Sequence, residues 1–211
     1  MVENIAWLGH DSFRIEGSRT VYVDPWKIAS GAPQADVILV THDHFDHLSK
    51  DDIARLRKPD TVVVGPAEVT SQVAGETRTI AVGQTIEVGG VTVHAVPAYN
   101  TDKFRGPGQV FHPRADGKVG YVVELDGRRI YHAGDTDAIP EMDDIEVDVA
   151  LLPVSGTYVM TADEAAQACD RVKAKLVVPM HYGDIVGTAA DARRFKERCP
   201  LPVEILEKSA R

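Results

Sequence analysis

The sequence predicts an α/β protein in which helices cover β-sheets. Short runs rich in valine and isoleucine recur between turn residues, and this pattern is typical of strands. The pairs Gly89-Gly90 and Asp126-Gly127 each separate two such runs, as in β-hairpins with two-residue turns. Segments with a helix start are fewer and alternate with strands later in the chain. This mixture favours sheets with helices packed on their faces.

Two of the apolar runs, residues 37–40 and 176–178, are continuous, so we expect central strands that are covered on both faces. Segments 36–42 and 175–181 look alike, since each is an apolar strand that ends in a histidine, and 147–153 is a weaker third copy. This likeness indicates two similar halves. The strands are expected at 21–23, 37–40, 61–64, 84–88, 91–96, 120–125, 129–132, 149–152, 176–178 and 203–206.

Helix starts are marked by capping residues. Ser49, followed by two acidic residues in the first turn, predicts a helix over 49–58, and Thr161 with Glu164 forms a capping box that opens a helix to about 173. Further helices are expected over 66–73 and 188–198. The irregular stretch 99–118 is long for a compact domain, and such loops are usually functional. No linker divides the chain, so residues 1–211 are expected to form one domain.

The charge balance limits the partners. Among the 211 residues, 23 lysines and arginines stand against 32 acidic residues, which gives a net charge of −9. Such a chain repels phosphate backbones and anionic membranes, so nucleic acid is an unlikely partner. There is no long apolar span and no signal-peptide pattern, and Cys169 and Cys199 make no disulfide framework. These features predict a cytoplasmic protein that acts on a small molecule.

Histidines and carboxylates gather directly after the strand at 37–40. His42, His44, Asp46 and His47 follow it in the pattern His-x-His-x-Asp-His. Imidazole nitrogens and carboxylate oxygens suit zinc, iron or manganese. Residues two apart in a tight loop project the same way, so His42 and His44 can hold one ion, while Asp46 and His47 can start a second.

Two other strand ends have the same character. Residues 130–136 end a strand and turn at Gly134 into Asp135, and residues 178–183 end a strand at His181. Each feature alone is common in proteins. Together with the first motif, they place residues of types that commonly bind metal ions at three strand ends.

These motifs resemble the metallo-β-lactamase superfamily, and the opening residues 7–13 and the strand end at Asp24 resemble its branch with ascorbate-6-phosphate lactonase-like proteins and N-acylphosphatidylethanolamine-hydrolysing phospholipase D. The resemblance implies a four-layer αββα sandwich of two similar halves, classed as α/β or, in some schemes, α+β. It also implies two divalent metal ions, with zinc expected and manganese or iron as alternatives, and a metal-bound hydroxide as nucleophile. The first ion would be held by His42 and His44, the second by Asp46, His47 and His181, and Asp135 would bridge them.

The sequence departs from the family where Asn100 stands in place of a usual histidine. Either Asn100 binds the first ion weakly through its amide oxygen, or His112 from the long loop replaces the missing ligand. Among catalytic candidates, Asp46 would orient the nucleophile, and His10 and His132 would lie near the metals. Asp24 is a candidate for orienting a ligating histidine.

We therefore expect a metal-dependent hydrolase that cleaves an ester, lactone or phosphoester bond in a small substrate. Lys103, Arg105 and Arg114 fall on one loop and favour an anionic, phosphorylated substrate. Two alternatives stay open. One is a nuclease on the same scaffold, and the other is a non-catalytic metal-binding or sensor protein. A homo-oligomer is compatible with the sequence.

Overall fold

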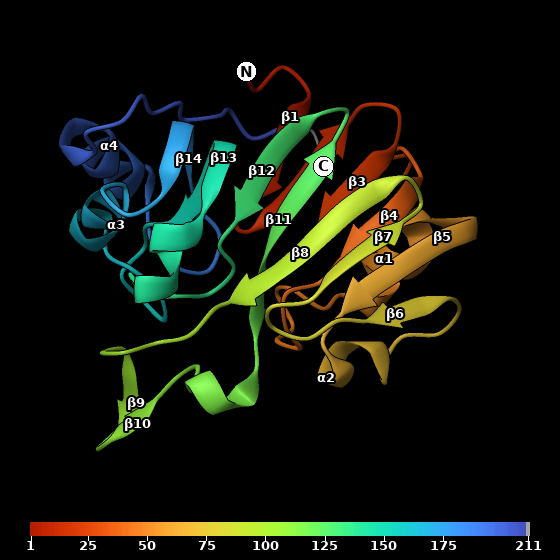
Figure 1. Ribbon diagram of the computed structural model, residues 1–211, viewed down its shortest axis with the longest axis horizontal. Coiled ribbons are helices and arrows are strands. Elements are labelled where there is room, and N and C mark those ends of the chain that lie inside the picture. The colour runs from red at the N-terminus through yellow and green to blue at the C-terminus, as the bar shows by residue number, and fades with distance from the viewer. Residues whose placement is uncertain (210–211) are drawn as a thin grey trace.

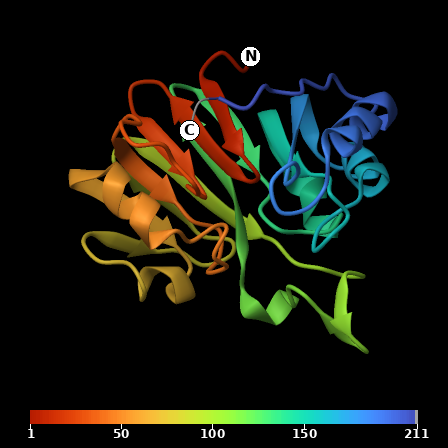
Figure 2. The same ribbon diagram turned by 180° about the vertical axis from the view of Figure 1, so that it is seen from behind.

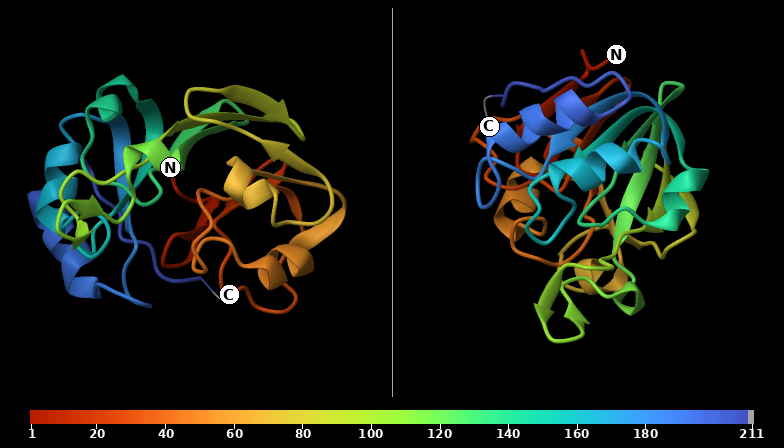
Figure 3. Two further views of the ribbon diagram at one scale, coloured as in Figure 1. Left: turned by 90° about the horizontal axis from the view of Figure 1, so that it is seen from below. Right: turned by 90° about the vertical axis from the view of Figure 1, so that its left-hand side faces the viewer.

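The computed structural model describes residues 1–209, so the last two residues of the expected domain lie outside the described part. Two six-stranded sheets pack face to face. Helices α1 (Lys50–Leu56) and α2 (Ala67–Thr70) lie on one outer side, and α3 (Ala162–Ala168) and α4 (Ala189–Arg198) lie on the other (Figures 1 and 3). This arrangement confirms the four-layer αββα sandwich.

The first sheet is built in chain order from β1 to β6. Its first three strands pair antiparallel, and the pairs from β3 onward are parallel. The strands are β1 (Ile5–Gly9), β2 (Ser12–Glu16), β3 (Thr20–Val23), β4 (Ala35–Leu39), β5 (Arg57–Gly65) and β6 (Thr77–Thr79).

The second sheet has the order β14-β13-β12-β11-β8-β7, and it too changes from antiparallel pairs to parallel ones, at β12. The halves are therefore similar, but β4 corresponds by position to β13 and not to β14, whose sequence it resembles. The strands are β7 (Thr85–Val88), β8 (Val91–Pro97), β11 (Val119–Leu125), β12 (Arg128–His132), β13 (Glu146–Pro153) and β14 (Lys173–Met180).

Side-chain alternation along β4 builds both hydrophobic layers of the first half. Val37 and Leu39 point into the main core between the sheets, whereas Ile38 packs on the outer side with Ile53 and Leu56 of α1. Because every residue of this run is buried, the strand is continuously apolar, as the sequence predicted for a strand covered on both faces.

Several sequence predictions need correction. Strand β14 lies at the edge of its sheet and not at its centre. The prediction was wrong because an apolar run indicates that both faces of a strand are covered but says nothing about how many strands pair with it. The strand expected over 203–206 is absent, and only Val203 makes a bridge, to Val177. The helix predicted to run to residue 173 ends at Ala168. Both hairpins are confirmed, with positive φ at both turn residues as type I′ turns require, for example +52° at Asp126 and +74° at Gly127.

The long stretch 99–118 contains a small hairpin of β9 (Phe104–Gly106) and β10 (Gln109–Val110), which projects from the body (Figure 2). Short 3₁₀ turns follow at Arg114–Asp116 and Pro140–Asp144. Cys169 and Cys199 end α3 and α4, and their sulfur atoms lie 2.6 Å apart. Across residues 1–209, no helix has the length and apolar character needed to span a membrane, and the cellular compartment stays a prediction.

Candidate metal centre

The polar strand ends predicted from the sequence meet at one edge of the sandwich. Parallel strands point their carboxyl ends the same way, so the segments after β3, β4, β12 and β14 converge there with the β1–β2 turn. Positive φ occurs at non-glycine residues of this edge, among them His10 (+54°), Asp24 (+46°) and His181 (+59°). Backbone strain of this kind clusters at functional sites. The edge is thus held in an unfavourable conformation to aim its side chains.

The first ligand group joins His42, His44, His112 and Asp135. Nε2 of His42 lies 3.0 Å from Nδ1 of His44, which is 3.4 Å from Nε2 of His112. Donor atoms about 2.0 Å from a tetrahedral zinc ion lie roughly 3.3 Å from one another. The three imidazoles are therefore spaced as ligands of one ion.

The second ligand group lies beside the first. His47 and His181 direct their Nε2 atoms at the same oxygen of Asp135, at 3.4 and 3.5 Å. Asp46 and His10 approach from one side, with 3.1 Å between Asp46 Oδ2 and His10 Nε2. Asp11 approaches from another, and these residues fall into two overlapping sets that could hold an ion. The structure therefore brings every sequence-predicted ligand to this edge.

Asp135 links the two groups. Its Oδ1 faces His47 and His181, and its Oδ2 lies 3.9 Å from His42 Nε2 and 3.7 Å from His112 Nε2. The turn that presents it requires a glycine, because Gly134 has φ +65° and a Cβ there would lie 2.8 Å from the carbonyl oxygen of Val119. This carboxylate is positioned as a bridge.

Several ring nitrogens that point away from the cluster have a partner, which fixes their tautomers. Nδ1 of His47 donates to Asp24 over 2.7 Å, and Nδ1 of His181 lies 2.8 Å from the Ser155 hydroxyl. The Thr41 hydroxyl donates to Asp24 at 2.7 Å and lies 3.0 Å from Nδ1 of His42. In the neutral form that can bind a metal, each of these imidazoles thus turns its Nε2 lone pair inward, and Nε2 of His47 and His181 has no hydrogen-bond partner within residues 1–209. These unpartnered buried atoms fit a cation.

The polar atoms of the Asn100 side chain make hydrogen bonds to groups other than the metal-ligating atoms. Its amide nitrogen donates to Asp137 at 3.1 Å and to the Tyr158 carbonyl at 2.8 Å, and its oxygen accepts the backbone N–H of His112 at 2.9 Å. Of the two alternatives for the first site, the geometry therefore favours His112, with Asn100 as the residue that positions it.

Protonation divides the cluster into two parts. Burial lowers the pKa of His42 and His44 and takes the pKa of His112 down to about 4, so these imidazoles are neutral near pH 7. Burial would also lower the pKa of His181, but the carboxylates of Asp11 and Asp135 outweigh it and raise this pKa to about 9. A metal ion can therefore bind the first ligand group without displacing a proton, but to bind the second group it must displace a proton from His181.

The carboxylate of Asp46 stays charged. Burial opposes its ionisation, but the hydrogen bond from His10 and the charge of His47 lower its pKa to about 2. Only 13% of its side chain is exposed, so this charge is presented in a confined space.

His132 does not join the cluster. Its Nε2 donates to the backbone carbonyl of Asp11 at 2.8 Å, and its Nδ1 accepts the N–H of Gly134 at 3.2 Å. Both ring nitrogens therefore brace the backbone next to the ligand groups. Sequence reasoning missed Asp11 as a ligand type, and its only signal was its place directly after His10.

A cavity of about 250 Å³ opens above the cluster. Its rim is apolar, and Phe45 (69% exposed) and Ile185 (40% exposed) stand at its mouth. Rings of Phe111 and Tyr158 meet edge to face, 4.7 Å apart. The lining residues are His44, Phe45, Asp46, Phe111, His112, Asp135, Tyr158 and Ile185.

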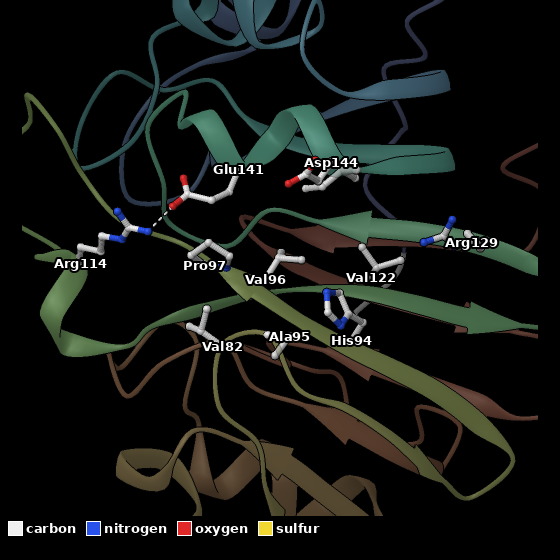
Figure 4. A pocket seen from close by; sticks show the side chains of 12 residues that line it. Val82, His94, Ala95, Val96, Pro97, Arg114, Val122, Arg129, Glu141 and Asp144 are labelled. Carbon is white, nitrogen blue, oxygen red and sulfur yellow. Dashed lines mark ion pairs between the residues drawn. The ribbon is translucent and has the colours of Figure 1, made fainter.

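The loop cations expected to bind an anion lie elsewhere. Lys103 pairs with Glu164 at 3.0 Å, and Arg114 pairs with Glu141 at 2.6 Å, while Arg105 lies in strand β9 of the projecting hairpin. The Arg114–Glu141 pair borders a separate cavity of about 300 Å³ beside β8 (Figure 4). No residue of the ligand groups lines that second cavity.

Comparisons with known proteins agree with this geometry. A family profile described as "Beta-lactamase superfamily domain" matches residues 4–181. A UPF0173 metal-dependent hydrolase of Methanoregula boonei is 38% identical over 202 residues, which cover 92% of this chain and 88% of that protein. Another, of Thermococcus onnurineus, is 34% identical over 225 residues and covers 96% and 94%.

Solved structures show the same likeness. A candidate metal-dependent hydrolase of Parabacteroides distasonis has a TM-score of 0.82 at 32% identity, over 97% of this chain and 93% of that chain. Igni18, a metallo hydrolase of Ignicoccus hospitalis, has a TM-score of 0.77 at 22% identity, over 97% and 95%, which is a likeness of fold alone. The chain therefore belongs to the metallo-β-lactamase superfamily, among its metal-dependent hydrolases.

Proposed function

We propose that this protein holds two divalent ions and hydrolyses an ester, lactone or phosphoester bond in a small substrate that carries an apolar group beside that bond. The observation that carries the proposal is Asp135, which presents one oxygen to each ligand group below an apolar-walled cavity. Two bound ions, zinc or else manganese or iron, would lower the pKa of a water toward neutrality and polarise the carbonyl or phosphoryl oxygen.

The residues of the chain would hold and orient the reactants. His42, His44 and His112 would bind one ion, and Asp46, His47 and His181 the other, with Asp135 shared. Asp46 lies at the cavity floor and stays ionised, so it can accept a hydrogen bond from the attacking water and hold it toward the substrate. His10 holds the Asp46 carboxylate in place through its 3.1 Å contact.

The cavity favours an apolar substrate portion over a strongly anionic one. At about 250 Å³ it admits only a small molecule or one end of a larger one. Lys103 and Arg114, which prompted the expectation of a phosphorylated substrate, are neutralised by acidic partners outside the lining. Phe45, Phe111 and Ile185 instead offer apolar surface, so burying an alkyl or aromatic group there is favourable.

The alternatives fit these observations less well. A nuclease needs cationic side chains along its substrate groove, and neither Lys nor Arg lines this cavity. A non-catalytic metal-binding protein would not need an ionised carboxylate and an open cavity over its ions, because structural sites are closed by their own ligands.

A metal count combined with a substrate panel tests the proposal. The purified protein is loaded with zinc, manganese or iron, its metal content is measured, and p-nitrophenyl acetate, p-nitrophenyl butyrate, an alkyl lactone and bis-p-nitrophenyl phosphate are offered. We expect two ions per chain, about one in His112→Ala, and turnover that a chelator abolishes and metal restores. The butyrate should be preferred over the acetate. If a fully loaded protein turns over none of these compounds faster than the free ion, the proposal is wrong.

A further inference from the structure

A buried carboxylate outside the expected ligand set points into the second ligand group. Asp11 lies in the β1–β2 turn and is fully buried, and neither of its oxygens has a hydrogen-bond partner within residues 1–209. Its Oδ2 lies 3.6 Å from Nε2 of His47 and 3.7 Å from Nε2 of His181. These are the same two nitrogens that Asp135 faces, and all four donor atoms lie within 4.8 Å of one another.

Such a carboxylate is costly unless something charged binds it. A buried ionised group without hydrogen bonds loses its hydration, and in proteins this is tolerated where a cation or a partner charge replaces the water. No lysine or arginine contacts Asp11 among the described residues, and the nearest cationic groups are imidazoles at 3.6 Å or more. Nε2 of His47 and of His181 is likewise unpartnered. Three groups without partners therefore face one point.

The backbone around Asp11 is fixed to aim it there. His132 donates to the Asp11 carbonyl at 2.8 Å, the indole of Trp7 donates to the His10 carbonyl at 2.9 Å, and the His181 N–H donates to the same carbonyl at 3.1 Å. The turn is thereby tied to the end of β14, so Asp11 and His181 keep their relative position. This gives His132 a role as a positioning residue.

We propose that Asp11 is a ligand of the second ion and makes the two sites chemically unlike. The proposal rests on the proposed function, since it requires that the cluster holds two ions. The second group then offers three carboxylates, Asp11, Asp46 and Asp135, beside the imidazoles of His10, His47 and His181, whereas the first has three imidazoles and only the shared Asp135. Oxygen-rich sites suit manganese, and imidazole-rich sites suit zinc. The structure thus assigns an oxygen-preferring ion to the second site and zinc to the first.

The test compares wild type with Asp11→Asn, which keeps the side-chain shape, and with Asp11→Ser, which removes the carboxylate entirely. Each protein is stripped of metal, given one equivalent of zinc, and titrated with Mn²⁺ while the electron paramagnetic resonance signal of free Mn²⁺ is followed. We expect wild type to bind one Mn²⁺ beside one zinc. Both variants should bind Mn²⁺ at least about tenfold more weakly, because even losing a residue that only supports a ligand costs that much, and zinc affinity at the first site should stay within about twofold.

Thermal unfolding separates ligation from a merely structural role. Because Asp11 is fully buried and neither of its oxygens has a hydrogen-bond partner within residues 1–209, a charge on it destabilises the metal-free fold, so Asp11→Asn should unfold in chelator at the same temperature as wild type or a higher one. Mn²⁺ should then raise the unfolding temperature of wild type but not of Asp11→Asn. A variant that is destabilised in chelator yet binds Mn²⁺ as wild type does would show that Asp11 is structural, and the inference would be overturned.

A matched control is Asp52→Asn, another buried aspartate, whose carboxylate accepts the N–H groups of Lys27 and Ile28 away from both ligand groups. It should bind Mn²⁺ as wild type does. The experiment distinguishes a failure of this inference from a failure of the proposed function. If wild type binds two ions and Asp11→Asn does as well with unchanged affinity, only this inference is refuted. If wild type itself binds fewer than two ions, the proposed function falls and this inference with it.

Discussion

Asp24 offers the sharpest test of how this chain prepares its ligands, through the substitution Asp24→Asn. The Asp24 carboxylate is fully buried and accepts three hydrogen bonds, from the Thr41 N–H at 2.8 Å, the Thr41 hydroxyl at 2.7 Å and Nδ1–H of His47 at 2.7 Å. Asparagine retains one oxygen for Thr41 and tolerates the positive φ of this position. Its NH₂ group, however, would face His47 where an acceptor stood.

The consequence falls on the tautomer of His47. A donor beside Nδ1 forces the proton to Nε2, the atom that points at the second ligand group, and a protonated nitrogen cannot bind an ion. A hydrogen bond between charged groups contributes about 1.5–3 kcal/mol, and at about 1.4 kcal/mol per tenfold change this corresponds to a loss of roughly 10- to 100-fold in metal affinity. That range agrees with the usual cost of removing a carboxylate that holds a metal-binding histidine.

The assay is a chelator competition that resolves two binding steps, with circular dichroism as a check of the fold. Asp126→Asn is the matched control, because Asp126 also has positive φ and accepts an N–H and a hydroxyl from one residue, Ser18, but lies at a distant hairpin turn. We expect one step to weaken in Asp24→Asn and neither step to change in Asp126→Asn. Equal affinities in Asp24→Asn and wild type, with both folded, would refute the tautomer argument.

Three further outcomes are expected. Asp36→Asn should lower the free energy of unfolding by about 1 kcal/mol at pH 7. Burial raises the pKa of Asp36, but the ammonium and N–H groups that contact it outweigh burial and lower that pKa. The stability is present above about pH 4 and is lost as pH falls through the lowered pKa, so the difference in unfolding free energy between wild type and variant, measured with urea, should be smaller at pH 3 than at pH 7. Mild oxidation should join Cys169 and Cys199, whose sulfurs are 2.6 Å apart, as seen by intact mass and loss of thiol labelling. Phe45→Ala should lower kcat/KM for the butyrate ester about tenfold without changing the unfolding temperature. Phe104→Ala, which removes another exposed phenylalanine but on the projecting hairpin, should change neither kcat/KM nor the unfolding temperature.

The candidate metal ligands on one short segment follow directly from their spacing in the sequence, whereas for the long loop the sequence left two alternatives, Asn100 and His112. His42, His44 and His47 follow a single strand, so their local spacing already indicates a shared site. His112 comes from the long loop, where Asn100, 12 residues earlier, accepts its backbone N–H. That contact belongs to the folded loop and leaves no periodic pattern in the sequence.

The cations that prompted the expectation of an anionic substrate likewise depend on contacts that the sequence does not report. Lys103 and Arg114 lie on one loop, but Lys103 pairs with Glu164 on helix α3, and Arg114 pairs with Glu141 in the 3₁₀ turn Pro140–Asp144. Acidic partners distant in the chain decide where a long cationic side chain goes, and sequence proximity does not report them. Asp11 was missed because a carboxylate in a turn is ordinarily exposed, whereas in the folded chain it is fully buried.

The site destabilises the metal-free fold, and this explains why it lies where the two halves of the sandwich meet. The first half contributes Asp11, Asp24 and His47, and the second contributes Asp135 and His181. Three of these are buried carboxylates, and oxygens of Asp11 and Asp135 have no hydrogen-bond partner within residues 1–209. Two residues of the set have positive φ, so the metal-free edge carries both poorly compensated charge and backbone strain. The large core between the sheets can offset such a cost, while no single strand pair could. Because ions that bind this edge would engage ligands from both halves and bind only the folded chain, they would stabilise the sandwich as a whole.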